Sequence, residues 1–94
     1  MNRRIEYTAR FRKDLKRYKN QKERICRIWE VVRMLEQGIP IPKSYRPHKL
    51  IGNYSGCLEL HIESDLLLIW KDLDESGLEV LRLIRLGSHS DLFG

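Results

Sequence analysis

The sequence feature that most constrains the fold is Leu66–Trp70, the longest unbroken apolar run in the chain. A membrane-spanning helix needs ~20 apolar residues, so this run is too short to cross a bilayer. A short apolar run that follows polar turn residues is typical of a strand buried on both faces. We therefore expect Leu66–Trp70 to be the central strand of a small sheet, and we expect no membrane association.

Three further segments have strand or turn patterns. Residues 57–62 alternate between two faces of a predicted strand. Leu58, Leu60 and Ile62 point to one face, and Cys57, Glu59 and His61 point to the other. This alternation places His61 on the face that points away from the core. Residues 3–7 and 78–86 predict a first and a last strand, and residues 63–65 predict a tight turn before the central run.

Two amphipathic helices are predicted between the first strand and Gly38. Thr8 offers an N-cap to the first helix, and Asn20 with Glu23 has the form of a capping box for the second. The apolar stripes recur at helical spacing, as Phe11, Leu15 and Tyr18, and then as Ile25, Ile28, Val32 and Leu35. Gly38 predicts a left-handed C-cap. Because the junction between them is short, we expect the helices to form an antiparallel hairpin on one face of the sheet.

The segment from residue 38 to residue 56 is rich in proline and glycine and predicts a long irregular connection. Long loops in compact domains are commonly functional, and His48 lies within this one. Together the elements predict an α+β fold, with a small, mostly antiparallel sheet and the order β-α-α-β-β-β. The helices would cover one face and leave the other open. The length of 94 residues suits one hydrophobic core, so we expect a single domain over residues 1–94.

Basic residues are concentrated in the first half of the chain. Residues 1–50 hold 15 Lys/Arg and 5 Asp/Glu, a net charge of +10, whereas residues 51–94 hold 3 and 8, a net charge of −5. This asymmetry favours a polyanionic partner such as RNA, or an acidic protein, although a solvated basic helix face is an alternative explanation. The N-terminus lacks the apolar segment of an export signal, and Cys26 and Cys57 form no CxxC pair. We therefore expect a cytoplasmic protein without a disulfide.

All three histidines lie in segments that the predicted sheet would bring together: His48 in the long connection, His61 on a strand, and His89 after the last strand. Cleaving RNA requires a base for the 2′-hydroxyl proton, a cation near the phosphate and an acid for the departing 5′-oxygen. Histidine serves as either base or acid near neutral pH. Asp65, four residues beyond His61, is placed to orient an imidazole or to raise its pKa.

The last strand offers an arginine for the phosphate. Arg82 and Arg85 fall on opposite faces by parity, and Arg85 is nearer to His89, so we expect Arg85 on the open face. Each candidate also has an ordinary structural explanation. These are a surface position for His61, a solvated loop for His48, a turn for Asp65, a cap for His89 and a C-terminal anchor for Phe93.

Three histidines and a carboxylate are also a potential metal-ligand set. No pair of them has the i, i+4 helical spacing or the CxxC form of common metal sites. We therefore rank metal binding below metal-free acid–base chemistry, and we predict neither a metal site nor a cofactor.

Two longer stretches, RPHKLIGNYSGCLELHIESDLLLIW and RLIRLGSHSDLF, carry a resemblance to a known family, supported more weakly by IEYTARFRKDLKR near the start. The chain resembles the YafQ branch of the RelE/ParE superfamily, the bacterial toxins of type II toxin–antitoxin modules. The joint pattern of H-x-L-x-G, H-I-x-x-D and L-G-S-H-x-x-L-F in one short chain is specific, whereas each piece alone is weak.

The resemblance implies a RelE-like fold and a ribosome-dependent endoribonuclease that cuts mRNA in the A site of the 70S ribosome. It also implies neutralisation by an acidic, DinJ- or RelB-like antitoxin. The toxin–antitoxin complex would be hetero-oligomeric and would bind its operator through the antitoxin.

The family's functional residues carry over to matching positions, which are His48, His61, Asp65, His89 and Phe93. In this assignment His89 is the general acid and His48 or His61 is the base. Phe93 would help to hold the nucleotide and Arg85 the phosphate. Arg46 and Lys49, which flank His48, are expected to bind substrate as well.

One position departs from the pattern, because some relatives carry an aromatic residue directly after the matching aspartate, where this chain has Leu66. The resemblance therefore leaves open whether this position makes a stacking contact and which codons are preferred. The superfamily also contains gyrase-directed toxins of the same fold, so a non-catalytic ParE-like inhibitor of gyrase or another protein is the alternative function. A partner-binding protein without activity is a third hypothesis. The three histidines and the aspartate favour the nuclease.

Overall fold

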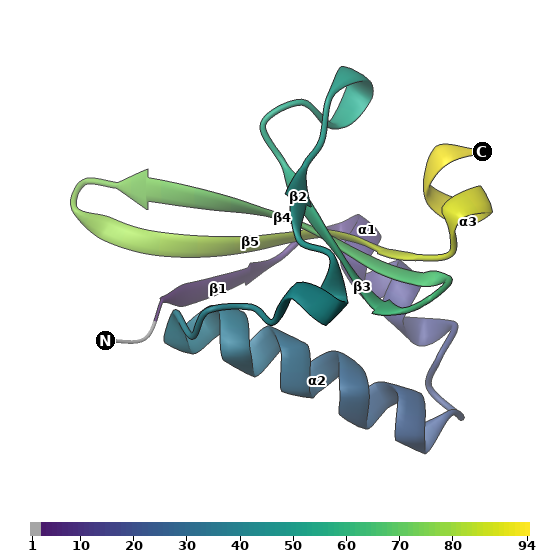
Figure 1. Ribbon diagram of the computed structural model, residues 1–94. Coiled ribbons are helices and arrows are strands. Elements are labelled where there is room, and N and C mark those ends of the chain that lie inside the picture. Colours follow the sequence, from purple (N-terminus) through teal and green to yellow (C-terminus); the bar gives the residue numbers. More distant parts are fainter. Residues whose placement is uncertain (1–2) are drawn as a thin grey trace.

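The computed structural model describes residues 3–94. Its elements are β1 (Arg4–Tyr7), α1 (Ala9–Lys16), α2 (Lys22–Gln37), η1 (Lys43–Tyr45), β2 (His48–Lys49), η2 (Gly52–Tyr54), β3 (Leu58–Glu63), β4 (Leu66–Glu75), β5 (Leu78–Gly87) and α3 (His89–Phe93). The strands form one sheet in the order β1-β5-β4-β3-β2 (Figure 1). β1 runs parallel to β5, and the other neighbouring strands are antiparallel. The predicted α+β class and mostly antiparallel sheet are confirmed.

The structure adds a strand and a helix that the sequence analysis did not predict. β2 is only two residues long and lies within the segment that was expected to be irregular. α3 is a single short helix in place of the expected tail. Both elements are too short to show a periodic pattern. β4 also runs well beyond the apolar run, as far as Glu75, so only Ser76 and Gly77 form the turn before β5.

The helix boundaries match the sequence at two of three predicted positions. The Thr8 hydroxyl oxygen caps α1 as expected. Gly38 ends α2 with a φ of +71°, a left-handed conformation that glycine adopts without strain. The capping box predicted at Asn20 is wrong, because Gln21 is the N-cap of α2 and makes no side-chain cap bond. Asn20 instead lies in a tight turn, in which the Gln21 amide donates to the Tyr18 carbonyl at 2.9 Å.

Both helices contribute to one hydrophobic core, which confirms that they share a face of the sheet. α1 packs against β5 and α2 against β3. The fully buried side chains at the centre of this core include Phe11, Ile28, Leu60, Leu68, Leu81 and Leu83. Burying a side chain of this size contributes roughly 1.5–3 kcal/mol, so this layer fixes the helices on the sheet.

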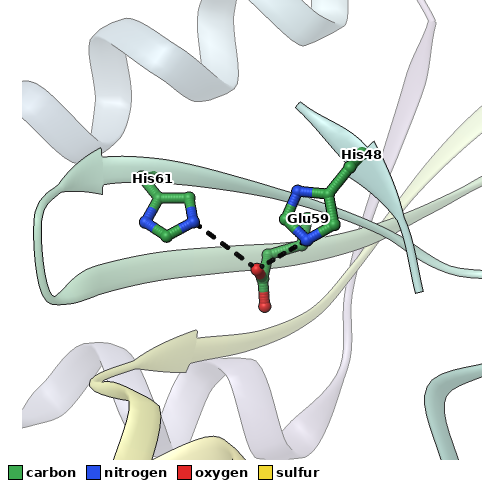
Figure 2. A group of neighbouring side chains, drawn as sticks. All are labelled: His48, Glu59 and His61. Atoms are coloured by element: carbon green, nitrogen blue, oxygen red, sulfur yellow. Dashed lines mark ion pairs between the residues drawn. The ribbon is translucent and has the colours of Figure 1, made fainter. Parts of the chain in front are cut away.

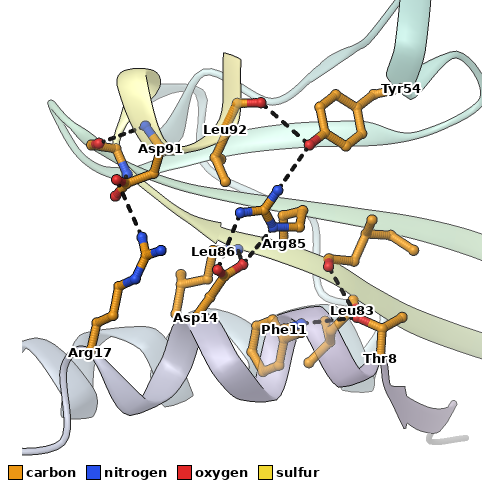
Figure 3. Close-up of polar contacts among 12 residues, drawn as sticks. Thr8, Phe11, Asp14, Arg17, Tyr54, Leu83, Arg85, Leu86, Asp91 and Leu92 are labelled. Carbon is orange, nitrogen blue, oxygen red and sulfur yellow. Dashed lines mark hydrogen bonds and ion pairs between the residues drawn. The ribbon is translucent and has the colours of Figure 1, made fainter. Parts of the chain in front are cut away.

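α1 also covers the part of β5 that β1 leaves unpaired. β1 pairs with β5 only from Val80 to Leu83. Beyond that point the Asp14 carboxylate accepts bonds from the Leu86 amide at 3.0 Å and from Arg85 Nε at 2.7 Å (Figure 3). Unpaired strand edges invite pairing with other chains. Asp14 therefore satisfies an edge amide that no strand reaches.

The face opposite the helices was expected to be open, and the structure corrects this expectation. A second, smaller apolar cluster covers part of that face, formed by Cys57, Leu67, Ile69 and Leu92. Leu92 comes from α3, so this cluster holds α3, and with it His89, against the sheet.

Both cysteines are free, as predicted, although Cys26 is exposed. Within residues 3–94, no helix has the length and apolar character needed to cross a membrane.

Candidate active site

Strand β2 carries His48 to the side of β3. The antiparallel pairing sets His48 opposite Glu59, and alternation along β3 puts His61 on the same face as Glu59. Nε2 of His48 lies 3.1 Å and Nε2 of His61 lies 3.8 Å from Oε1 of Glu59 (Figure 2). Imidazoles from two strands therefore meet at one carboxylate.

Glu59 is the site residue that the sequence analysis missed. Its side chain is buried, with 3% exposure, and its Oε2 has no hydrogen-bond partner within residues 3–94. A buried carboxylate is costly unless donors or cations surround it, and the two imidazoles are the groups beside it. The available signal was its place two residues before His61 on an alternating strand.

Both ring nitrogens of His48 face oxygen acceptors. Nδ1 lies 2.8 Å from the Arg46 carbonyl oxygen, and Nε2 lies 3.1 Å from Glu59. Both nitrogens of His48 are therefore engaged within the chain, whereas His61 stands too far from Glu59 for a direct hydrogen bond.

Asp65, in the turn between β3 and β4, holds His89 at the start of α3. Its Oδ1 accepts a bond from the His89 backbone amide at 2.9 Å and lies 2.7 Å from Nδ1 of the ring. These bonds, the backbone one foremost, hold the pKa of the Asp65 carboxyl below its usual range. Because Nδ1 is engaged by Asp65, Nε2 is the nitrogen of His89 that is left for a substrate.

Contacts from the rest of the molecule fix α3, which is too short to be stable alone. Arg17, the C-cap of α1, pairs with Asp91 at 3.2 Å. The Tyr54 hydroxyl donates to the Leu92 carbonyl at 3.3 Å and accepts from Arg85 at 3.2 Å (Figure 3). The position of His89 thus depends on α1, η2 and β5 as well as on Asp65.

The three imidazoles form a continuous row with His61 in the middle. Its ring centroid lies 6.1 Å from that of His48 and 5.6 Å from that of His89. The structure therefore brings together the predicted residues His48, His61, Asp65 and His89. Titratable groups that flank one point from two sides are what acid–base cleavage of a phosphodiester requires.

The structure corrects the predicted exposure of Arg85. Only 7% of Arg85 is exposed, and its Nε and Nη2 lie 2.7 and 3.2 Å from the two oxygens of Asp14. Arg85 pairs with Ile69 of the smaller apolar cluster, so it lies on the predicted face of the sheet, but it is buried there against Asp14 and Tyr54. No sequence pattern indicated that Asp14 would approach this strand. A buried guanidinium that is paired in this way supports the fold around the site and does not present itself to a surface phosphate.

The remaining predicted substrate contacts lie at the surface. Phe93 is half exposed and packs edge-on against Tyr54, with the ring centroids 5.6 Å apart. Arg46 and Lys49 are exposed. Neither forms an ion pair with another residue of the described chain. These three side chains are therefore free to contact a ligand.

Comparison with family models matches residues 3–94 to the bacterial toxin of type II toxin–antitoxin system, YafQ. The chain belongs to the YafQ toxin family. A curated relative from Escherichia coli K12, mRNA interferase toxin YafQ, is 32% identical over 91 residues, which cover 96% of this chain and 95% of that protein. The family predicted from the motifs is confirmed.

Solved structures of YafQ-like toxins share this fold. The crystal structure of the E. coli DinJ–YafQ toxin–antitoxin complex matches 100% of this chain and 100% of that chain, with 32% identity and a TM-score of 0.85. A metal-bound toxin from Helicobacter pylori is 34% identical, with a TM-score of 0.82, over 99% of this chain and 100% of that one.

In this YafQ-family chain the position after Asp65 belongs to the core. Leu66 is 2% exposed and packs in the large cluster beneath the helices. Its side chain is therefore directed away from the histidine face. A stacking contact from Leu66 to a nucleotide is incompatible with this placement.

The same YafQ-family site contains three residues that could hold a metal ion. His48, Glu59 and His61 each offer one ligand atom, and these atoms lie within 4.8 Å of one another. Ligand atoms in a tetrahedral zinc site are about 3.3 Å apart, so small side-chain rotations would bring the three into range. The sequence analysis looked for helical and CxxC spacing, which a ligand set formed across two strands does not show.

Proposed function

We propose that the protein is an mRNA interferase, an endoribonuclease that cleaves mRNA and so arrests translation. The observation that carries this proposal is the convergence of three imidazoles with two carboxylates, namely His48, His61, His89, Asp65 and Glu59. The E. coli relative, which is similar to this chain over 96% of its residues, is named for the same activity. A toxin that only binds a protein target has no need for such a set.

The proposed reaction is attack by the 2′-hydroxyl of one nucleotide on its own 3′-phosphate. A base removes the hydroxyl proton, a 2′-oxygen–phosphorus bond forms, and the bond from phosphorus to the 5′-oxygen of the next nucleotide breaks. An acid gives its proton to that departing oxygen. The products are a 2′,3′-cyclic phosphate and a free 5′-hydroxyl, and no metal ion is required.

His89 is the proposed acid. Asp65 fixes its ring through Nδ1, which leaves Nε2 to carry the proton for the leaving oxygen. His89 also stands at one end of the histidine row. An acid at that end acts on the leaving group while the base acts from the other side of the phosphate.

His61 is the proposed base, with His48 as its neighbour. His61 lies next to His89 in the row, and its Nε2 has only the distant Glu59 carboxylate beside it, at 3.8 Å. That nitrogen is free to accept a proton. His48 bridges the Arg46 carbonyl and Glu59, so its role is to hold the Glu59 carboxylate in place beside His61.

Exposed side chains around the histidines supply the substrate contacts. Phe93 offers an aromatic surface for a base, and such stacking contributes about 1–3 kcal/mol per base. Arg46 and Lys49 offer charges for the backbone of the RNA. Arg85, in contrast, acts through Tyr54 by holding α3.

A metal ion is proposed to inhibit this reaction. The H. pylori relative is a metal-bound toxin, and this chain has its own three-residue ligand set in His48, Glu59 and His61. An ion there would occupy the nitrogens that must exchange protons. Metal binding and cleavage are therefore mutually exclusive in this proposal.

The proposed partners follow from the charge asymmetry and from the relatives. YafQ of E. coli has been solved with its antitoxin DinJ, and the +10 charge of residues 1–50 favours a DinJ-like antitoxin that is acidic. The complex would be hetero-oligomeric and would bind its operator through the antitoxin. The same basic surface suits ribosomal RNA, so we infer that the protein acts in the cytoplasm on mRNA in the A site of the 70S ribosome.

Primer extension in a reconstituted translation reaction tests this function. The wild type and His89→Ala are each incubated with mRNA, with and without ribosomes. The expected result is cleavage at defined in-frame positions by the wild type only, and only with ribosomes. Ser90→Ala, a small change at an exposed position of the same helix, is the matched control and should cleave as the wild type does.

Uncut mRNA under all conditions, with a wild type that still arrests cell growth, would overturn the proposal. In that case an assay of gyrase supercoiling would decide whether the gyrase-directed alternative holds. Cleavage by a folded His89→Ala protein at the wild-type rate would overturn the role of His89 as the acid.

A further inference from the structure

A cavity of about 450 Å³ opens beside His61, between η1 and the turn that joins β3 to β4. Its polar lining comes from Ser44, Tyr45, Arg46, His61, Glu63 and Ser64. The volume falls in the ~300–1,000 Å³ range that is typical of small-molecule sites. The cavity and the histidine row therefore share one residue, His61.

The cavity exists because β2 is short. β2 pairs only with Leu58 and Glu59, so the rest of β3 has no strand on that side. η1 lies next to this free part of β3 instead (Figure 1). Arg46, with a left-handed φ of +51°, then turns the chain from η1 towards β2. A single helical turn fills a sheet edge less completely than a strand does, and the cavity is the space that remains.

The lining of the cavity has the chemistry of a nucleoside site. Ser44 and Ser64 are exposed, and their hydroxyls both donate and accept hydrogen bonds. Tyr45 is half buried and offers an aromatic ring, and Arg46 offers an exposed guanidinium. Bases of single-stranded RNA are recognised by stacking on such groups and by hydrogen bonds to the base edges.

The surroundings of the cavity carry excess positive charge. Glu63 pairs with Arg24 at 2.8 Å and with Arg27 at 2.6 Å, so two guanidinium groups share one carboxylate. Arg24, Arg27 and Glu63 together carry a net charge of +1 beside the cavity, and Arg46 adds a further positive charge. A phosphate attached to a nucleoside in the cavity would therefore meet favourable charge.

We propose that this cavity binds the nucleotide on the 5′ side of the cleaved bond. The inference rests on the proposed function, because the 2′-hydroxyl that His61 deprotonates belongs to that nucleotide, which must therefore lie against His61. The cavity is the space next to His61 that can receive its base. Phe93, four residues beyond His89, contacts the nucleotide on the 3′ side, whose 5′-oxygen departs. The cavity then selects the base at the cleavage position.

Single-turnover cleavage on ribosomes programmed with different A-site codons tests the proposal. Ser44→Trp fills the cavity, and Arg46→Asn removes the charge with a residue that tolerates the left-handed conformation. Lys43→Gln is the control, because Lys43 is an exposed cation of the same η1 that does not line the cavity. Thermal unfolding and antitoxin binding show whether each variant is folded.

With Ser44→Trp, the half-saturating toxin concentration should rise about tenfold, as expected for the loss of one base contact. The preference for the base on the 5′ side should change, while preferences at the other codon positions and the behaviour of Lys43→Gln stay as in the wild type. Arg46→Asn should raise the half-saturating toxin concentration in the same way. If Ser44→Trp does not fold, the result with Arg46→Asn tests the proposed nucleotide site by itself.

Unchanged base preference and unchanged half-saturation in the folded variants, with a wild type that cleaves, would overturn the cavity assignment alone. A wild type that cleaves no codon would overturn the proposed function itself. The two failures are therefore distinguishable within one experiment.

Discussion

Asp65 is joined to His89 twice through a single oxygen, at 2.9 Å to the backbone amide and at 2.7 Å to Nδ1 of the ring. The backbone bond fixes where α3 begins, and the ring bond fixes how the imidazole is turned. The two residues are 24 positions apart in sequence. A turn residue and a helix start therefore act as one unit, in which the carboxylate sets both the place and the orientation of the proposed acid.

The Asp65→Asn substitution keeps the shape of this side chain and removes its negative charge. The amide oxygen still accepts a bond from the His89 amide, but the side chain no longer carries the negative charge that lies 2.7 Å from Nδ1 of the ring. We expect the single-turnover cleavage rate on programmed ribosomes to fall about 100-fold, in the lower part of the range for general acid–base catalysis, with the cleavage positions unchanged. A rate within about twofold of the wild type would show that the charge of Asp65 has no part in the reaction.

The same pair makes the stability of the fold depend on pH. The pKa of Asp65 is lowered from its ordinary value of 3.8, first by the backbone bond and then by the ring bond of His89. The folded state therefore favours the charged form, so this stabilisation is complete above the unfolded pKa and is lost as pH falls through the lower folded value.

The Tm difference between the wild type and Asp65→Asn should therefore shrink as the pH falls below about 4. Thermal unfolding followed by circular dichroism across this range measures it. A difference that grows on acidification would have the wrong sign for a carboxylate whose pKa is lowered.

Arg85 and Arg82 both lie on β5, but their removal should lower the stability of the fold by very different amounts. Arg85→Met leaves the Asp14 carboxylate buried without its cation, and we expect a loss of roughly 3 kcal/mol in the free energy of unfolding. Arg82→Met removes a surface pair with Glu6 and should lower the free energy of unfolding far less. Urea denaturation of both variants measures the difference. Equal costs would contradict the placement of Arg85 in a buried pair.

Zinc should bind to the group formed by His48, Glu59 and His61 and should inhibit cleavage. Isothermal titration calorimetry of the free protein is expected to show one ion per chain. Glu59→Gln should weaken zinc binding by at least about tenfold, whereas His89→Ala, outside the group, should leave it unchanged. Zinc that binds equally well to Glu59→Gln would place the ion elsewhere, and unimpaired cleavage with zinc bound would show that the two imidazoles need not be free.

Local patterns in the sequence predicted much of this structure. The alternation of residues 57–62 gave the face on which His61 lies, Thr8 gave the start of α1, and Gly38 gave the end of α2. Each of these depends only on near neighbours in sequence. For the same reason, the motif pieces around the histidines were sufficient to identify the family.

The features that were missed depend on register between distant segments. β2 is two residues long, so only its pairing with β3 reveals that His48 faces Glu59. Arg85 lies on the predicted face, opposite Ile69, but its burial was missed because Asp14 approaches it from α1. The cavity beside His61 follows from the length of β2, which no local pattern reports.

The most direct test of the central claim is to remove the attacking group from the substrate. Once the cleavage position is mapped, two mRNAs are compared on programmed ribosomes under single-turnover conditions, one with a ribonucleotide and one with a 2′-deoxynucleotide on the 5′ side of the cleaved bond. The account predicts that only the ribonucleotide is cut, with a 2′,3′-cyclic phosphate at the new end. Equal cleavage of the deoxy-substituted mRNA would contradict it, because the histidine row could then not be acting through the 2′-hydroxyl.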